Sequence, residues 1–173
     1  MSCRIEIAQA QDAAAILGLI RGLAEYERLS HEVVATESDL RRTLFGPRPA
    51  AETLLAYPAD APAGAGGGSG SGGTPVGFAL YFTSYSTFLG RAGIYLEDLF
   101  VLPAHRGQGF GRALFSRVAQ IAVERDAGRM EWSVLDWNEP ALKFYRAMGA
   151  QPMSEWTVQR LTGAALRRAA QSP

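Results

Sequence analysis

The sequence predicts an α/β fold in which helices flank a mixed central β-sheet. Short apolar or alternating runs, typical of strands, take turns with longer segments whose apolar residues recur every three or four positions, typical of amphipathic helices. Turns rich in glycine or proline separate these segments. The chain has 173 residues, a length that fits one core, so we expect a single domain over residues 1–173.

The first third of the chain should contain two strands and two helices. Residues 4–8 alternate apolar and polar side chains and predict a short strand. An amphipathic helix should follow, with Asp12 as its N-terminal cap. Thr36 and Asp39 resemble a capping box at the start of a second, shorter helix. Residues 52–57 then predict the second strand.

A low-complexity segment rich in glycine and serine occupies about residues 58–75. Such a composition buries too little apolar surface to offset the entropy of ordering the chain. We expect a flexible connection within the domain, because the entropy of closing a loop grows slowly with its length. A functional lid is the alternative interpretation, although this composition offers nothing that would bind a ligand specifically.

The remainder of the chain should alternate strands with helices. The predicted elements are strands at 76–83, 94–102, 130–135 and 155–161, and helices at 109–126, 139–148 and 163–170. Gly128 is expected to end the first of these helices, and Gly149 to cap the second at its C-terminal end.

The connection between the strand ending at Leu102 and the next helix carries three glycines at a spacing of two. Strand, glycine-rich turn and helix together direct several free backbone amides at one anionic group, and the helix dipole favours a phosphate there. Glycine allows close approach and left-handed backbone angles. Arg106 and Arg112 flank the turn and add positive charge. A tight connection without a ligand is the alternative interpretation.

Composition excludes several other kinds of function. The 17 basic and 17 acidic residues cancel, so no overall positive field would recruit nucleic acid or an anionic membrane. The single cysteine excludes an internal disulfide framework, and the two histidines, far apart in sequence, make no recognisable metal site. No apolar run approaches a membrane span, and the N-terminus lacks a secretory apolar region. We therefore expect a cytoplasmic protein.

Three motifs occur in order along the chain: Leu-Glu-Asp-Leu-Phe-Val at 96–101, Arg-Gly-Gln-Gly-Phe-Gly at 106–111, and Trp-Asn-Glu-Pro-Ala-Leu-Lys-Phe-Tyr at 137–145. Together they resemble the diamine (spermidine/spermine) acetyltransferase branch of the GNAT superfamily, which includes thialysine acetyltransferases. Leu-Ala-Glu-Tyr-Glu at 23–27 also fits this branch, so the resemblance covers most of the chain. The glycine turn alone would indicate only the superfamily, whereas the other motifs indicate the branch.

The resemblance implies a GNAT fold and direct transfer of acetyl from acetyl-coenzyme A to an amine within a ternary complex, with no metal. At pH 7 only about one primary amine in a few thousand is neutral, so the site must accept a proton. By resemblance, Tyr145 is the general acid toward the coenzyme sulfur. Glu97 binds the amine or acts as a base through water. The family also implies a homodimer.

Further site residues follow from the same resemblance. The expected coenzyme-binding residues are Leu99, Phe100, Val101, Arg106, Gly107, Gln108, Gly109, Phe110, Gly111, Arg112, Asn138 and Ala141. Backbone groups of Leu99 and Val101 should pair with the pantetheine arm like an added strand. The expected substrate-binding residues are Tyr26, Glu27, Glu97, Asp98, Glu131, Trp132 and Ser133.

Each role has a simpler alternative. Tyr145 fits an ordinary half-buried aromatic residue, and Glu97 fits a solvated strand position. Asp98 should face away from Glu97 by strand alternation, unless a bulge intervenes.

Residues 84–91 lack the acidic residue that the family typically carries there, and Arg91 adds a positive charge, which weakens the case for a long polycation. A small polyamine, a diamine and a thialysine-like amino acid all stay open as substrates. The rival functions are a GNAT enzyme acting on a protein, peptide or antibiotic amine, and a non-catalytic coenzyme A-binding module.

Overall fold

A computed structural model describes residues 3–60 and 73–171, in two compact units formed by residues 1–133 and 134–173. Most of the glycine- and serine-rich segment expected at 58–75 lies outside the described residues. The expectation of a single domain stays a prediction.

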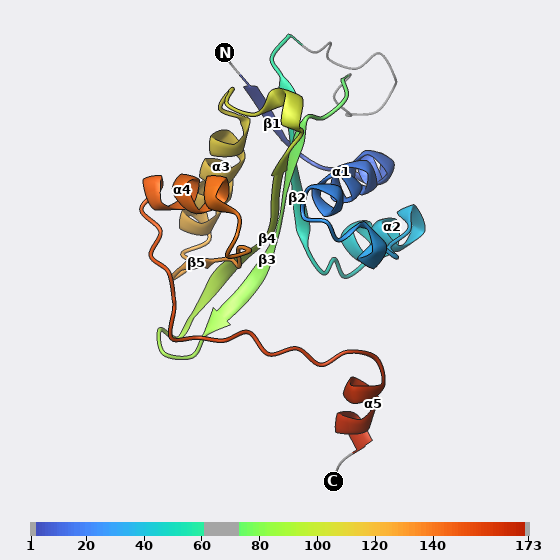
Figure 1. Ribbon diagram of the computed structural model, residues 1–173, viewed down its shortest axis with the longest axis vertical. Coiled ribbons are helices and arrows are strands. Elements are labelled where there is room, and N and C mark those ends of the chain that lie inside the picture. Colours follow the sequence, from blue (N-terminus) through green and yellow to red (C-terminus); the bar gives the residue numbers. More distant parts are fainter. Residues whose placement is uncertain (1–2, 61–72, 172–173) are drawn as a thin grey trace. The chain divides into compact units, whose positions relative to one another are not determined.

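The first unit is built on a five-stranded sheet in the order β1-β2-β3-β4-β5 (Figure 1). Its strands are β1 (Cys3–Ile7), β2 (Glu52–Pro58), β3 (Gly77–Ser86), β4 (Arg91–Val101) and β5 (Met130–Glu131). The first four pair antiparallel, and β5 pairs parallel to β4. The predicted mixed α/β architecture is therefore confirmed.

Helices cover both faces of this sheet. Helices α1 (Ala13–Tyr26) and α2 (Glu37–Phe45) lie on one face and α3 (Phe110–Glu124) on the other (Figure 1). Single 3-10 turns follow β1, α1 and β4, and these are η1 (Ala10–Asp12), η2 (Ser30–Glu32) and η3 (Pro103–His105).

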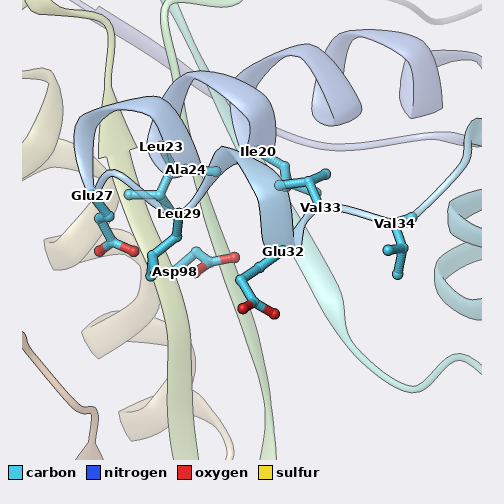
Figure 2. Close-up of a pocket in the computed structure, with 10 residues that line it drawn as sticks. Ile20, Leu23, Ala24, Glu27, Leu29, Glu32, Val33, Val34 and Asp98 are labelled. Atoms are coloured by element: carbon cyan, nitrogen blue, oxygen red, sulfur yellow. The ribbon is translucent and has the colours of Figure 1, made fainter.

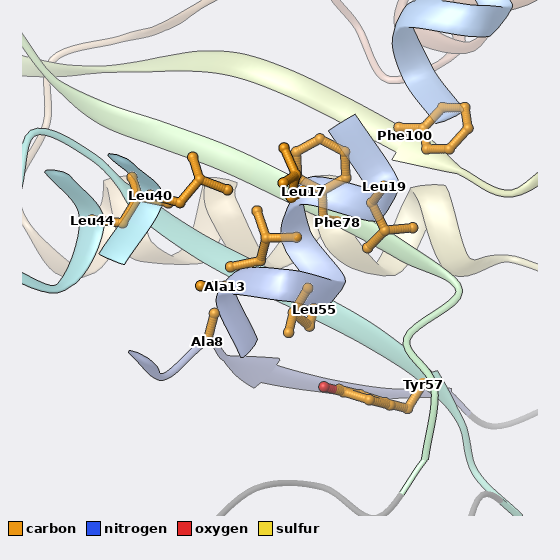
Figure 3. Packing of buried hydrophobic residues seen from close by; sticks show 11 residues of the cluster. Ala8, Ala13, Leu17, Leu19, Leu40, Leu44, Leu55, Tyr57, Phe78 and Phe100 are labelled. Carbon is orange, nitrogen blue, oxygen red and sulfur yellow. The ribbon is translucent and has the colours of Figure 1, made fainter. Parts of the chain in front are cut away.

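The main hydrophobic cluster fills the space between the sheet and helices α1 and α2 (Figure 3). Ile16 of α1 is fully buried, as is Phe78 of β3, and Phe100 of β4 is nearly so. Each such side chain stabilises the fold by about 1.5–3 kcal/mol relative to exposure. Gly22 lets α1 approach Phe100, because a Cβ at this position would lie 3.1 Å from the phenylalanine ring.

Helix α3 buries the apolar stripe that its sequence predicts. The buried residues are Phe110, Leu114, Phe115, Val118, Ile121 and Ala122. Just beyond the helix, Arg125 donates two hydrogen bonds to the carboxylate of Glu52 on β2, at 2.6 and 2.7 Å. The Tyr81 hydroxyl donates to the same carboxylate. Burial and the neighbouring Glu52 raise the pKa of Tyr81 to about 12, so this hydroxyl keeps its proton.

Two capping predictions have different outcomes. The capping box of α2 is confirmed: the Asp39 amide donates to Thr36 Oγ1, and the Thr36 amide donates to Asp39 Oδ2. The prediction for Asp12 is wrong in mechanism. Asp12 occupies the N-cap position of α1, but its carboxylate accepts the amide of Gln9 at 2.7 Å. Asp12 therefore closes the preceding 3-10 turn.

The end of α3 also differs from the prediction. Asp126, with a φ of 51°, supplies the left-handed residue after the helix, so Gly128 does not end it. After this turn, β5 contains only Met130 and Glu131, and the strand predicted to continue to residue 135 stops early.

The second unit contains α4 (Glu139–Ala147) and α5 (Gly163–Gln171). Gly149 has a φ of 90°, which confirms its predicted role as the C-terminal cap of α4. The strand predicted at 155–161 is wrong, because this segment is irregular and exposed. A strand needs a paired neighbour, and within the described part of this unit no segment forms a ladder with it. No helix among residues 3–60 and 73–171 is long and apolar enough to span a bilayer.

Candidate active site

A β-bulge in β4 sets the positions of Glu97 and Asp98. Leu80 of β3 pairs with Asp98, and the next residue, Tyr81, pairs with Leu96. Glu97 is therefore an extra residue opposite the β3 ladder, and its side chain is exposed. Asp98 shares a face with Leu80, the face covered by α1. The sequence analysis named such a bulge as one of two alternatives. The bulge places two adjacent carboxylates at the point where the ladder is irregular.

A pocket of about 290 Å³ opens beside Asp98 (Figure 2). The C-terminal half of α1, the η2 turn and the loop after it form the rest of the wall. The lining residues are Ile20, Leu23, Ala24, Glu27, Leu29, Glu32, Val33, Val34, Ala35 and Asp98. Apolar side chains make up most of this wall, and every charged lining residue in it is acidic. An apolar wall with carboxylates suits an aliphatic cation.

Asp98 is the most strongly perturbed carboxyl group of the site. Burial, together with the negative charges of Glu97 and Glu27, raises the pKa of Asp98 to about 7. Burial also raises the pKa of Glu27. Because its pKa lies close to neutrality, Asp98 can take up or release a proton near pH 7.

Arg106 connects the glycine turn to the end of α1. Its guanidinium carbon lies 4.2 Å from the centre of the Tyr26 ring and 5.6 Å from that of Phe100. Its Nε donates a hydrogen bond to the carbonyl of Val101 at 3.0 Å. Two predicted site residues, Arg106 and Tyr26, are thus in direct contact. The carbonyl of Val101, expected to pair with pantetheine, already accepts one hydrogen bond.

The glycine turn has the backbone conformation that an anion-binding turn requires. Gly107 and Gly109 have φ values of 74° and 92°, which favour glycine. A Cβ at either position would meet no atom within 4 Å, so the space beside the turn is open. Gly109 is the N-cap of α3 and offers no side chain to the first-turn amides. These residues fit a pyrophosphate group of the kind that acetyl-coenzyme A carries.

Other residues expected around the turn have local roles. The Gln108 side chain donates to the carbonyl of Ala104 at 3.2 Å, and the Phe110 side chain is buried. Arg112 is exposed on the first turn of α3. The contribution of Phe110 to an anion site is therefore limited to its backbone.

The residues expected near β5 make contacts away from the pocket. Glu131 forms an ion pair with Arg129 at 2.7 Å. Trp132 packs edge-on against Phe115 of α3, which lies on the other face of the sheet from α1. The Ser133 hydroxyl lies 2.8 Å from the Tyr95 hydroxyl. None of the three lines the pocket beside Asp98.

Three predicted site residues belong to the second unit. The half-buried Tyr145 packs against Phe144, with ring centres 5.3 Å apart. Asn138 is buried, and its Oδ1 accepts the amide of Ala141 at 3.3 Å, which caps α4. Their contacts with coenzyme stay predictions.

Sequence reasoning did not identify Leu29, Glu32 and Val33 as pocket residues. They follow the Tyr-Glu motif of α1, in a turn that has no regular periodicity. The available signal was the segment Leu-Ser-His-Glu-Val at 29–33, in which an acidic residue lies between apolar ones shortly after an amphipathic helix.

The comparison that decides the family is a match of residues 31–150 to the model described as "Acetyltransferase (GNAT) family". The chain belongs to the GNAT family. It is an acetyl-coenzyme A-dependent N-acetyltransferase.

Similar GNAT proteins include the thialysine N-epsilon-acetyltransferase of Mus musculus, 40% identical over 98% of each chain. The L-ornithine N5-acetyltransferase NATA1 of Arabidopsis thaliana is 37% identical, with 96% of this chain and 87% of the relative covered. Among solved structures, an integron cassette protein from V. cholerae superposes with a TM-score of 0.76 at 26% identity, covering 99% of each chain.

Proposed function

We propose that this protein transfers acetyl from acetyl-coenzyme A to a primary amine of a small aliphatic substrate, in a ternary complex. The substrate is a diamine, a small polyamine or an amino acid with a terminal amine. The observation that carries this proposal is the pocket beside the β4 bulge, where Glu27 and Asp98 meet an apolar wall. The relatives named for thialysine and L-ornithine support the same class, because both acceptors combine an alkyl chain with a terminal amine.

The reaction joins the amine nitrogen to the thioester carbon, and the sulfur leaves as a thiolate. The nitrogen loses two protons between the ammonium and the amide, and the thiolate gains one. Glu97 accepts the proton of the incoming ammonium through a water molecule, while Asp98 and Glu27 hold the amine by charge. Tyr145 gives a proton to the thiolate, and the second proton that the nitrogen loses on forming the amide restores the Tyr145 hydroxyl through solvent. A positioned acid or base of this kind contributes about 10²–10⁴-fold to the rate.

The glycine turn and its flanking arginines hold the coenzyme. Amides of residues 107–112 face the pyrophosphate, and Arg106 and Arg112 supply positive charge. Backbone groups of Leu99 and Val101 pair with pantetheine, and Asn138 and Ala141 contact the coenzyme. The enzyme acts in the cytoplasm as a homodimer. Light scattering of the purified protein would test the dimer.

The deciding experiment mixes purified protein with acetyl-coenzyme A and single amines, and follows release of free thiol. The panel contains spermidine, putrescine, thialysine, ornithine, a lysine-containing peptide and an aminoglycoside. We expect release with the small aliphatic amines, and a loss of about 10²-fold or more in kcat for Glu97→Gln and Tyr145→Phe. Release only with the peptide or the aminoglycoside would favour a protein- or antibiotic-directed enzyme. Coenzyme binding without release would favour a regulatory module.

A further inference from the structure

We infer that Glu32 senses the far end of the amine acceptor and makes this enzyme favour diamines over amino acids that carry the same terminal amine. The inference rests on the proposed function and deepens it. It concerns one residue of the η2 turn, outside the motifs that carry the family resemblance.

Glu32 belongs to the η2 turn, which forms the pocket wall next to the one formed by α1. In the view of Figure 2, Asp98 lies between Glu27 and Glu32, and all three belong to the pocket lining. Asp98 and Glu27 adjoin the bulge where the reacting amine is proposed to bind. Glu32 lines the same pocket together with Leu29 and Val33. We therefore place the part of an elongated acceptor that does not react beside Glu32.

The charge balance of this wall disfavours a carboxylate. Every charged residue of the pocket lining is an acid. His31 Nε2 lies 3.4 Å from the Glu32 carboxylate, with both side chains more than 70% exposed. The adjacent Arg28 side chain is exposed and does not line the pocket. A second ammonium is thus attracted here, and an α-carboxylate is repelled.

The size of the effect follows from the exposure of Glu32. Two unit charges 4 Å apart in water interact by about 1 kcal/mol, which is about fivefold in an equilibrium constant, and the interaction is stronger near a protein surface. Because water reaches Glu32, we expect discrimination of about 5- to 10-fold from this single residue.

Matched pairs of acceptors isolate the carboxylate. Cadaverine is lysine without its carboxylate, and putrescine is ornithine without it, so chain length and terminal amine are constant within each pair. The measured quantity is the ratio of kcat/KM for the diamine to kcat/KM for the amino acid, at one fixed pH for every variant. Glu32→Gln should lower this ratio about 5- to 10-fold, and Glu32→Arg should lower it further.

Glu25→Gln is the matched control, because Glu25 is an exposed acid of α1 that does not line the pocket. It should leave the ratio within about twofold of wild type, since screening weakens distant surface charges. An unchanged ratio in both Glu32 variants, with acetyl transfer intact, would overturn the role of Glu32 and leave the proposed function standing. Absence of acetyl transfer to all four acceptors would instead overturn the proposed function.

Discussion

At the scale of single residues, Asp98 shows a conflict between stability and chemistry. Its pKa of about 7 lies well above the ordinary aspartate value, because of burial and the nearby Glu97 and Glu27. Between about pH 4 and pH 7 the folded protein keeps a proton that the unfolded chain has lost. The contribution of this group to stability therefore falls as the pH rises through that window.

We predict that Asp98→Asn stabilises the protein at pH 8 and impairs acetyl transfer. Asparagine fixes the uncharged form, so the gain should be about 1–2 kcal/mol at pH 8, allowing for solvent screening of a group that is mostly but not fully buried. This corresponds to a rise of about 3–6 °C in Tm. Near pH 4 the Tm should hardly change. Asp136→Asn, at an exposed aspartate, is the control, and an equal Tm gain in both variants at pH 8 would contradict the argument.

At the scale of elements, the contact between Arg106 and Tyr26 joins the glycine turn to the C-terminal end of α1. The planar guanidinium stacks on the ring while its Nε bonds to Val101. Lysine keeps the charge but cannot reproduce this stacked, hydrogen-bonded geometry. The two functions of Arg106, positive charge near the turn and support of α1, can therefore be separated by substitution.

We predict that Arg106→Lys and Arg106→Ala both raise the KM for the amine by about 2- to 5-fold, the value of an exposed cation–π contact. The KM for acetyl-coenzyme A should rise mainly in Arg106→Ala, which removes the charge. Steady-state kinetics with each substrate varied in turn checks both values. Arg112→Lys, on the other side of the turn, serves as the control and should leave the amine KM unchanged. A normal amine KM in Arg106→Lys would show that the stack does not support the acceptor site.

Elements with a strong local signal could be predicted from sequence, whereas elements that depend on distant partners could not. The capping box of α2 lies within four residues, and the apolar stripe of α3 recurs within one helix. The strand predicted at 155–161 has the right alternation, but alternation does not supply a neighbouring strand. The bulge at Glu97 is likewise a property of two strands, β3 and β4, so sequence could offer it only as an alternative.

In the candidate site, too, residues with a local sequence signal could be predicted and features that depend on distant residues could not. Glu27, Asp98 and the glycine turn were identified because their motifs are short and contiguous. The raised pKa of Asp98 was not predictable, since it depends on burial and on Glu27, which is 71 residues away (98 − 27). Glu32 was missed because its position in the pocket depends on the path of a turn.

At the scale of the whole molecule, the balance of 17 basic and 17 acidic residues means that a charged substrate meets no overall attraction. Any electrostatic contribution to binding must come from local groups, which in the proposed function are chiefly the carboxylates of the pocket lining. Local fields are also screened by salt, because the Debye length falls from about 30 Å at 10 mM to about 8 Å at 150 mM.

We predict that kcat/KM for a diamine falls about threefold between 10 and 150 mM sodium chloride. A monoamine of equal chain length should show a smaller fall, because it presents one charge instead of two to the acidic wall. Thiol-release assays at constant pH across the salt series check both values. Identical salt dependence for the two amines would place the attraction elsewhere on the protein.

The bulge in β4 also has a consequence for redesign of the enzyme. Glu97 has no pairing residue on β3, so sheet pairing constrains its side chain little. Its neighbour Asp98 is both paired and half-buried. Position 97 is therefore a tolerant one, at which acid, amide or imidazole groups can be exchanged without rebuilding the strand. The proton acceptor that we propose, Glu97, thus occupies a position at which folding constrains the side chain little.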